Sequence, residues 1–211
     1  ADGTSKFPKL NDACPAYHGM NFNAVFGPTG PFGCNMAFIF HARVIALRDM
    51  GGCQNPFGSF QLMVGLETLA LRGRAHCDNA NRLAAWLEAH DEVEWCKHPS
   101  LASHDSHELA KKYFRDGCFG AVLSFGLKGN GKERGAKFID SVKLASHLAN
   151  VGDAKTLVIH PSSTTHQQLT DAEQTTAGVS PAMIRVSVGI EDYADIQADF
   201  EQAIQAACGK K

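Results

Sequence analysis

An arginine interrupts an apolar stretch near the end of the sequence, "IRVSVGIED" at residues 184–192. Its alternation predicts a strand with Ile184, Val186 and Val188 on one face and Arg185 on the other. A guanidinium binds a carboxylate through two parallel charge-assisted hydrogen bonds, so Arg185 is a candidate for holding an anionic ligand. The pattern alone leaves three alternatives for what Arg185 faces: solvent, a carboxylate within the protein, or a ligand.

The sequence Asn150-Val151-Gly152 is a second candidate for anion binding. Glycine adopts backbone angles that other residues avoid and allows other groups to approach closely. The ordinary interpretation is the C-terminus of a helix followed by a turn. The alternative is that the Asn150 amide and the nearby backbone N–H groups face the same anion as Arg185.

Hydroxyl groups are concentrated in "IHPSSTTHQQL", directly after a predicted strand. Ser162, Ser163, Thr164, Thr165 and His166 follow one another there, and ligand-binding loops commonly follow strands. Taken alone, these residues favour an ordinary hydroxyl-rich turn. The sequence therefore indicates a candidate loop without assigning it a ligand.

Three of the ten histidines lie close together in "HPSLASHDSH". His104 and His107 are three residues apart and could share a helix face. No carboxylate or cysteine joins them at a spacing typical of zinc ligands, so we predict a surface loop and no metal site.

Composition limits the class of protein. Of 211 residues, 44% are hydrophobic and 20% charged, which is typical of a globular protein, and the net charge of −2 gives no reason to expect nucleic acid or an anionic membrane as partner. Seven scattered cysteines without a C-x-x-C pair favour a reducing compartment, so we expect a cytoplasmic protein. No apolar run approaches the roughly 20 residues of a membrane span, and the first residues do not resemble a signal peptide.

The N-terminal third is predicted to be irregular up to residue 33 and then helical. A first helix begins at Cys34 and is stopped by Gly51-Gly52. A second begins with Asn55 as N-cap and runs to about Ala89, with a possible bend near Gly73.

Further along the chain, predicted strands and helices interleave, which argues for a mixed sheet covered by helices. The predicted strands are residues 93–96, 120–127, 155–161 and 184–190, and the predicted helices are residues 106–114, 136–149, 171–178 and 192–207.

Three stretches together resemble the Cys/Met-metabolism family of pyridoxal-phosphate (PLP) enzymes: "NPFGSFQLMVGLETLALR", "VKLASHLANVGDAKTLVIHPSSTTHQQL" and "IRVSVGIED". The resemblance runs from about Tyr17 to Ala206. It implies an α/β fold, the fold-type I PLP-dependent transferase. Residues 1–74 would be the tail of the large PLP-binding domain and the start of a linking helix. Residues 75–211 would be the C-terminal small domain, with a mixed, largely antiparallel sheet covered by helices.

The same resemblance implies roles for the candidate residues. Arg185 matches the arginine that binds the substrate α-carboxylate, and Asn150 and Val151 match the position that completes this contact. The loop residues Thr164, Thr165 and His166 would border the active-site mouth.

The family's Schiff-base lysine, in an S-x-T-K type segment, has no match in this sequence. We therefore expect the chain to be the C-terminal half of such an enzyme, with no catalytic residue of its own. The cofactor, pyridoxal 5'-phosphate, would be bound mainly by the absent N-terminal half, so the chain alone should be inactive.

The implied activity is the conversion of O-acetylhomoserine and sulfide to homocysteine and acetate, in methionine and cysteine biosynthesis. Expected partners are the amino-acid substrate, the chain's own N-terminal half and sister subunits of a homotetramer. Alternatives are the related cystathionine γ-synthase and methionine γ-lyase activities, a nicked enzyme whose halves stay associated, or a non-catalytic assembly module.

Overall fold

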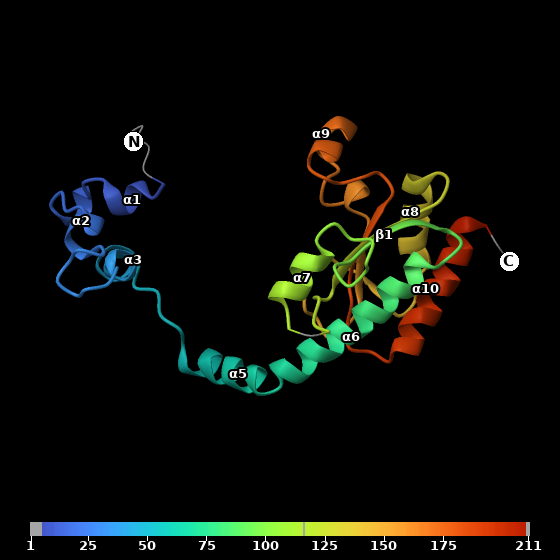
Figure 1. The fold of residues 1–211 in the computed structure, drawn as a ribbon, viewed down its shortest axis with the longest axis horizontal. Coiled ribbons are helices and arrows are strands. Elements are labelled where there is room, and N and C mark those ends of the chain that lie inside the picture. Colours follow the sequence, from blue (N-terminus) through green and yellow to red (C-terminus); the bar gives the residue numbers. More distant parts are fainter. Residues whose placement is uncertain (1–5, 116, 210–211) are drawn as a thin grey trace. The chain divides into compact units, whose positions relative to one another are not determined.

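The computed structural model describes residues 6–115 and 117–209 (Figure 1). The chain divides into two compact units, Ala1–Met63 and Val64–Lys211. The boundary lies inside the helix α5, which spans Pro56–Glu67. The functional division expected near Arg74, between a large-domain tail and a small domain, concerns the complete enzyme and stays a prediction. No helix in the described ranges is long and apolar enough to cross a membrane.

The first unit consists of short helical segments around Phe22, which is fully buried. Phe22 contacts the ring of His41 edge-on at 5.0 Å between centroids, and Phe26 stacks on Phe40 at 4.3 Å. The segments are α1 (Pro8–Asn11), a 3-10 helix (Pro15–Tyr17), α2 (Phe22–Phe26), α3 (Ala37–His41), a π-helix (Ala42–Leu47) and α4 (Arg48–Met50). The prediction of irregular chain up to residue 33 was therefore wrong in part, because aromatic packing organises three short helices there.

Two predicted helix boundaries of this region are confirmed. Gly51 ends α4 in the left-handed conformation with φ of 63°. The Asn55 side-chain oxygen accepts from the N–H of Gly58 at 2.7 Å, which is an N-cap contact.

The predicted long helix is divided into α5 and α6 (Leu69–Glu88). The break is at Thr68, so the predicted bend near Gly73 was misplaced. Arg72 compensates for the break: its guanidinium donates to the carbonyl of Gly65 at 3.1 Å and also to the Thr68 hydroxyl. These contacts give hydrogen-bond partners to a turn that lacks the regular backbone hydrogen bonds of a helix.

The second unit contains a five-stranded sheet with strand order β1-β2-β5-β4-β3. All neighbouring strands are antiparallel except β3 and β4, which are parallel. This confirms the predicted mixed, largely antiparallel sheet. The strands are β1 (Val93–Lys97), β2 (Val122–Leu127), β3 (Ser146–His147), β4 (Leu157–Ile159) and β5 (Met183–Ser187).

Three helices cover one face of the sheet, namely α6, α8 (Gly131–Ser141) and α10 (Tyr193–Cys208) (Figure 1). Phe138 of α8 packs edge-on against Phe125 of β2 at 5.4 Å and Phe200 of α10 at 5.2 Å between ring centroids. All three rings are fully buried and form the centre of the core. The short helices α7 (His107–Tyr113) and α9 (Asp171–Thr176) also lie where the sequence predicts them.

The helix predicted for residues 136–149 ends early, at Ser141. The carboxylate of Asp199, on α10, accepts from the N–H groups of Lys143, Leu144 and Ala145 at 2.7, 3.0 and 2.9 Å. These contacts hold the chain in an extended turn, and the residues that follow form β3. A charged acceptor from elsewhere in the chain thus outweighs the local helical pattern.

Candidate functional site

Arg185 lies in β5, the middle strand of the sheet, opposite Ser124 on β2 and Ile159 on β4. Its neighbours Ile184 and Val186 are fully buried in the core, so Arg185 projects from the opposite face. Arg185 is half-buried as a residue, and its guanidinium donates from Nη2 to the carbonyl oxygen of Asn150 at 3.3 Å. Within the described ranges, no carboxylate forms an ion pair with it. Among the described residues, Arg185 therefore has no carboxylate partner, and the solvent and ligand alternatives stay open.

Asn150 and Val151 lie in an exposed loop between β3 and β4. The side-chain oxygen of Asn150 accepts from the N–H of Val151 at 2.9 Å, so the amide NH₂ is the group of this side chain that can donate to a ligand. Gly152 has a φ of +76°, so the expected unusual backbone angle is confirmed. No helix ends here, because α8 stops at Ser141, and the helix-terminus interpretation is wrong.

The loop with Thr164, Thr165 and His166 follows the 3-10 helix Pro161–Ser163. Thr164 donates its hydroxyl to the carbonyl of His160 at 2.8 Å, and Thr165 and His166 contact each other through Oγ1 and Nδ1 at 2.9 Å. Gln174, which is 2% exposed, fixes the loop by donating from Nε2 to the His166 carbonyl at 2.8 Å.

His160 orders the start of this loop. Its ring is fully buried, with Nδ1 at 2.8 Å from the Ser163 hydroxyl and Nε2 at 2.8 Å from the Pro181 carbonyl. Burial lowers the pKa of His160, so the ring is neutral near pH 7. The carbonyl can only accept, which assigns the proton to Nε2 and makes Nδ1 the acceptor for Ser163.

The structure thus brings Arg185 and Asn150 into contact and places the Thr164–His166 loop at the end of β4, the strand that pairs with β5. In the described part of the chain no hydrogen bond or ion pair joins Arg185 to Thr164, Thr165 or His166. A single pocket formed by all six residues stays a prediction.

Sequence reasoning missed Ser187, Thr156 and Glu191. Ser187 accepts from the N–H of Gly152 at 3.3 Å, and Glu191 accepts from the N–H of Thr156 at 2.7 Å. Each contact links segments 35 residues apart in sequence, so no local pattern indicates it. The sequence contains a partial indication for Ser187. It is two residues from Arg185 in an alternating strand pattern and therefore lies on the same face.

The histidine-rich segment makes contacts within its own surroundings. His98 is fully buried, with Nδ1 at 2.7 Å from the Ser100 hydroxyl, and Nδ1 of His107 lies 2.9 Å from the Pro99 carbonyl. Within residues 6–115 and 117–209, no group of three or more His, Cys, Asp or Glu side chains is placed to hold a metal ion.

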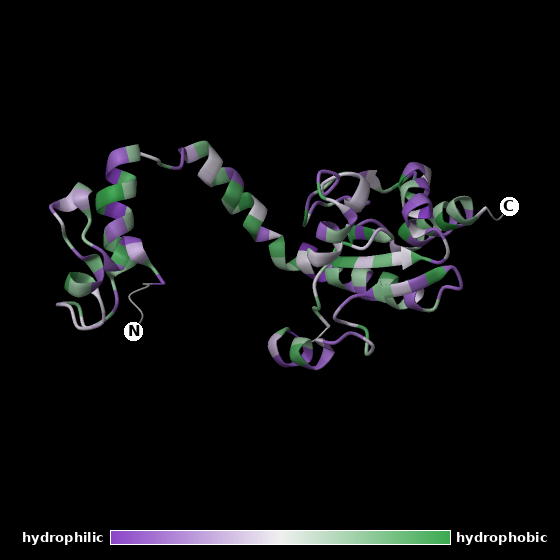
Figure 2. Cartoon of the chain, turned by 90° about the horizontal axis from the view of Figure 1, so that it is seen from above, coloured by the Kyte–Doolittle hydropathy of each residue, from purple (hydrophilic) through white to green (hydrophobic). Residues whose placement is uncertain are grey.

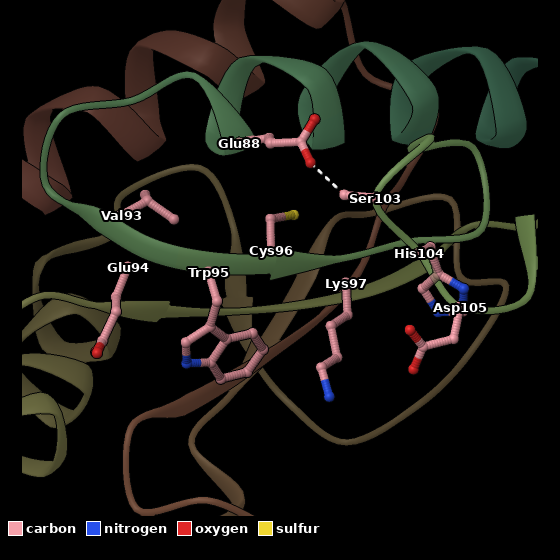
Figure 3. A pocket seen from close by; sticks show the side chains of 9 residues that line it. All are labelled: Glu88, Val93, Glu94, Trp95, Cys96, Lys97, Ser103, His104 and Asp105. Carbon is pink, nitrogen blue, oxygen red and sulfur yellow. Dashed lines mark hydrogen bonds between the residues drawn. The ribbon is translucent and has the colours of Figure 1, made fainter.

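A cavity of about 350 Å³ lies beside the edge strand β1 (Figure 3). Its lining includes Cys96, whose pKa is raised to about 12 by burial and, to a smaller extent, by Glu88. That thiol stays protonated and is a poor nucleophile. Glu88 itself accepts a hydrogen bond from Ser103 (Figure 3). Because β2 separates β1 from β5, this cavity is not part of the Arg185 site.

Comparison with solved structures defines the class of protein. A Campylobacter jejuni O-acetylhomoserine (thiol)-lyase, solved with a pyridoxyl-lysine phosphate residue, matches with a TM-score of 0.78 and 37% identity, over 97% of this chain and 46% of that chain. The fold is therefore the α/β fold of a PLP-dependent enzyme. Residues 27–205 match the family described as Cys/Met metabolism PLP-dependent enzyme, and the chain belongs to that family.

Two curated relatives refine this placement. The homocysteine synthase of Schizosaccharomyces pombe is 54% identical over 97% of this chain and 46% of its own length. The O-acetyl-L-homoserine sulfhydrylase of Leptospira meyeri is 48% identical over 96% of this chain and 46% of its own length. The chain therefore spans about half the length of the curated relatives it matches.

The residues of this site fit a substrate carboxylate better than they fit the cofactor. PLP is held in its enzymes through a lysine amine, and the two residues that flank Arg185 across the sheet, Ser124 and Ile159, carry no amine. Arg185 and the Asn150 amide instead present hydrogen-bond donors, which suit a carboxylate.

Proposed function

We propose that the chain is the C-terminal part of a PLP-dependent O-acetylhomoserine sulfhydrylase, which converts O-acetyl-L-homoserine and sulfide to homocysteine and acetate. Its contribution is the site for the substrate α-carboxylate. The observation that carries this proposal is the half-buried residue Arg185, whose guanidinium contacts the Asn150 carbonyl but no carboxylate of the described chain.

In this proposal Arg185 binds the α-carboxylate through two parallel hydrogen bonds, and the Asn150 amide donates a third. Val151, which is 58% exposed, covers one side of the substrate, and Thr164, Thr165 and His166 border the entrance. PLP, when bound, withdraws electrons from the substrate, and a fixed carboxylate decides which substrate bond is aligned for cleavage.

The remaining parts belong to the complete protein. We assign PLP binding to the segment that the relatives have in addition to the matched region. We also propose a cytoplasmic homotetramer; all seven cysteines are free, as expected in a reducing compartment.

The test is an activity assay on the complete enzyme loaded with PLP. We expect acetate release from O-acetyl-L-homoserine that depends on sulfide, with homocysteine as the product. A complete enzyme that uses cysteine as acceptor and forms cystathionine, or that cleaves methionine instead, would contradict the sulfhydrylase assignment. The isolated 211-residue chain serves as the control and should release no acetate.

A further inference from the structure

The loop with Asn150 is fastened to the chain just after Arg185 by hydrogen bonds that the carboxylate site itself does not use. At one end, the N–H of Gly152 donates to the Ser187 hydroxyl at 3.3 Å. Ser187 is 2% exposed and lies two residues from Arg185 on the same face of β5. Arg185 and Ser187 thus hold the loop at neighbouring points, Arg185 at the carbonyl of Asn150 and Ser187 at the N–H of Gly152.

At the other end, Glu191 holds Thr156. One carboxylate oxygen accepts from the N–H of Thr156 at 2.7 Å and the other from its hydroxyl at 2.8 Å. Each oxygen of Glu191 thus accepts a hydrogen bond from Thr156. In the described chain this acidic side chain, only six residues after Arg185, forms no ion pair with the guanidinium.

The Asn150 loop and the chain after Arg185 lie too close together to tolerate a side chain at Gly189. A Cβ there would lie 2.2 Å from Glu191 Oε2 and 2.5 Å from the Ala154 carbonyl oxygen. The N–H of Gly189 also donates to the Thr156 hydroxyl at 2.9 Å, and the N–H of Ile190 donates to the Ala154 carbonyl at 2.9 Å. The loop therefore has one fixed register relative to β5.

Helix α6 forms hydrogen bonds with the chain that follows Arg185. His76 Nδ1 lies 2.7 Å from the Val188 carbonyl, and Asn79 Nδ2 donates to the carbonyls of Gly189 and Glu191 at 3.1 and 2.9 Å. Both side chains are buried. The segment after Arg185 is thus a fixed support, to which the exposed Asn150 loop is attached.

We propose that Ser187 and Glu191 are positioning residues for the carboxylate site: through Gly152 and Thr156 they set the Asn150 loop against Arg185. Neither residue touches the substrate. This inference rests on the proposed function, because it concerns the same carboxylate.

The experiment uses the complete PLP-loaded enzyme with the variant Ser187→Ala. Removal of one hydrogen-bond acceptor should raise KM for O-acetylhomoserine about three- to tenfold. KM for sulfide and the absorbance of the bound cofactor should not change. Ser187→Thr keeps the hydroxyl and should restore KM for O-acetylhomoserine.

A double-mutant cycle with Arg185→Ala separates positioning from a general loss of stability. If Ser187 acts through the carboxylate site, Ser187→Ala should have little further effect on KM once Arg185 is absent. Additive effects, or an unchanged KM in Ser187→Ala, would overturn the inference. If Arg185→Ala itself leaves KM unchanged, the proposed function fails instead.

Thr156→Val provides an independent variant in case Ser187→Ala does not fold. Valine has nearly the shape of threonine but lacks the hydroxyl that joins Gly189 to Glu191. The same selective rise of KM for O-acetylhomoserine is expected. A uniform fall in kcat with KM unchanged would show a structural role only and would overturn the inference.

Discussion

Arg185 differs from Arg134 and Arg82 in what surrounds its charge. Arg134 lies 3.7 Å from the Glu92 carboxylate, and the guanidinium of Arg82 lies over the ring of Tyr193 at 3.8 Å. Within the described residues, the guanidinium of Arg185 has one hydrogen-bond acceptor, the carbonyl of Asn150 at 3.3 Å. A cation on a half-buried residue with a neutral acceptor is suited to an anionic ligand, which would supply the opposite charge.

At the residue scale, His160 gives a pH-dependent prediction. Burial keeps its pKa below the ordinary 6.5, so the unfolded chain binds more protons than the folded one as the pH falls through that value. His160 therefore contributes stability that is present above about pH 6.5 and lost below it. We expect the melting temperature of His160→Gln to decrease less between pH 7 and pH 5 than that of the wild type.

Protonation of other groups also lowers the stability of the folded protein as the pH falls, so a matched control is needed. Burial also lowers the pKa of His98, and hydrogen bonds lower those of Glu108 and Glu173. Gln167→Ala, at an exposed position, removes no titratable group and should keep the wild-type dependence on pH. Equal dependence in His160→Gln and wild type would contradict the assigned role.

At the scale of elements, sequence patterns succeed where local chemistry decides. The strand β5 and the helix α10 lie where alternation and helical periodicity predict them, because their buried faces are continuous in sequence. The predicted helix over residues 136–149 failed because its end is set by Asp199, more than 50 residues away. In the candidate site, Arg185 and Asn150 are predicted from their own residue types and from the family resemblance, although their contact also spans 35 residues. Ser187 and Glu191 carry no such signal, because only their distant partners reveal what they do.

The role of Asp199 can be measured directly. Asp199→Ala leaves three backbone N–H groups without an acceptor and should lower the free energy of unfolding by about 3 kcal/mol. Asp199→Asn keeps one oxygen and should cost about half as much. Urea unfolding followed by circular dichroism measures both. Asp195→Ala, on the exposed first turn of α10, is the control and should change stability by less than about 1 kcal/mol. An Asp199→Ala variant as stable as this control would refute the explanation of the helix end.

At the scale of the whole molecule, α5 indicates that more protein surrounds this chain. Apolar side chains occur on all sides of the helix, and Figure 2 colours much of it green. Phe57, Phe60, Leu62, Met63 and Leu66 are each at least 60% exposed. A helix that is apolar all round is normally buried, so we expect α5 to be covered by the remaining half of the enzyme or by a sister subunit.

The isolated chain should therefore self-associate. Sedimentation at micromolar concentration should show oligomers, and replacing both Leu62 and Leu66 with lysine should shift the chain toward the monomer. Leu109→Lys, at a 57% exposed position on α7, is the control and should not do so. A wild-type chain that stays monomeric would contradict the prediction that α5 is an interface.

Steady-state kinetics of the complete PLP-loaded enzyme test whether Arg185 binds the substrate α-carboxylate. Arg185→Ala should raise KM for O-acetylhomoserine and lower kcat/KM at least about tenfold, the effect of about 1.4 kcal/mol of lost binding. Lys111→Ala removes an exposed positive charge from α7 and should behave as the wild type. If Arg185 binds the carboxylate, only Arg185→Ala loses activity in this way, and an Arg185→Ala enzyme with kinetics close to those of the wild type would show that Arg185 does not bind it.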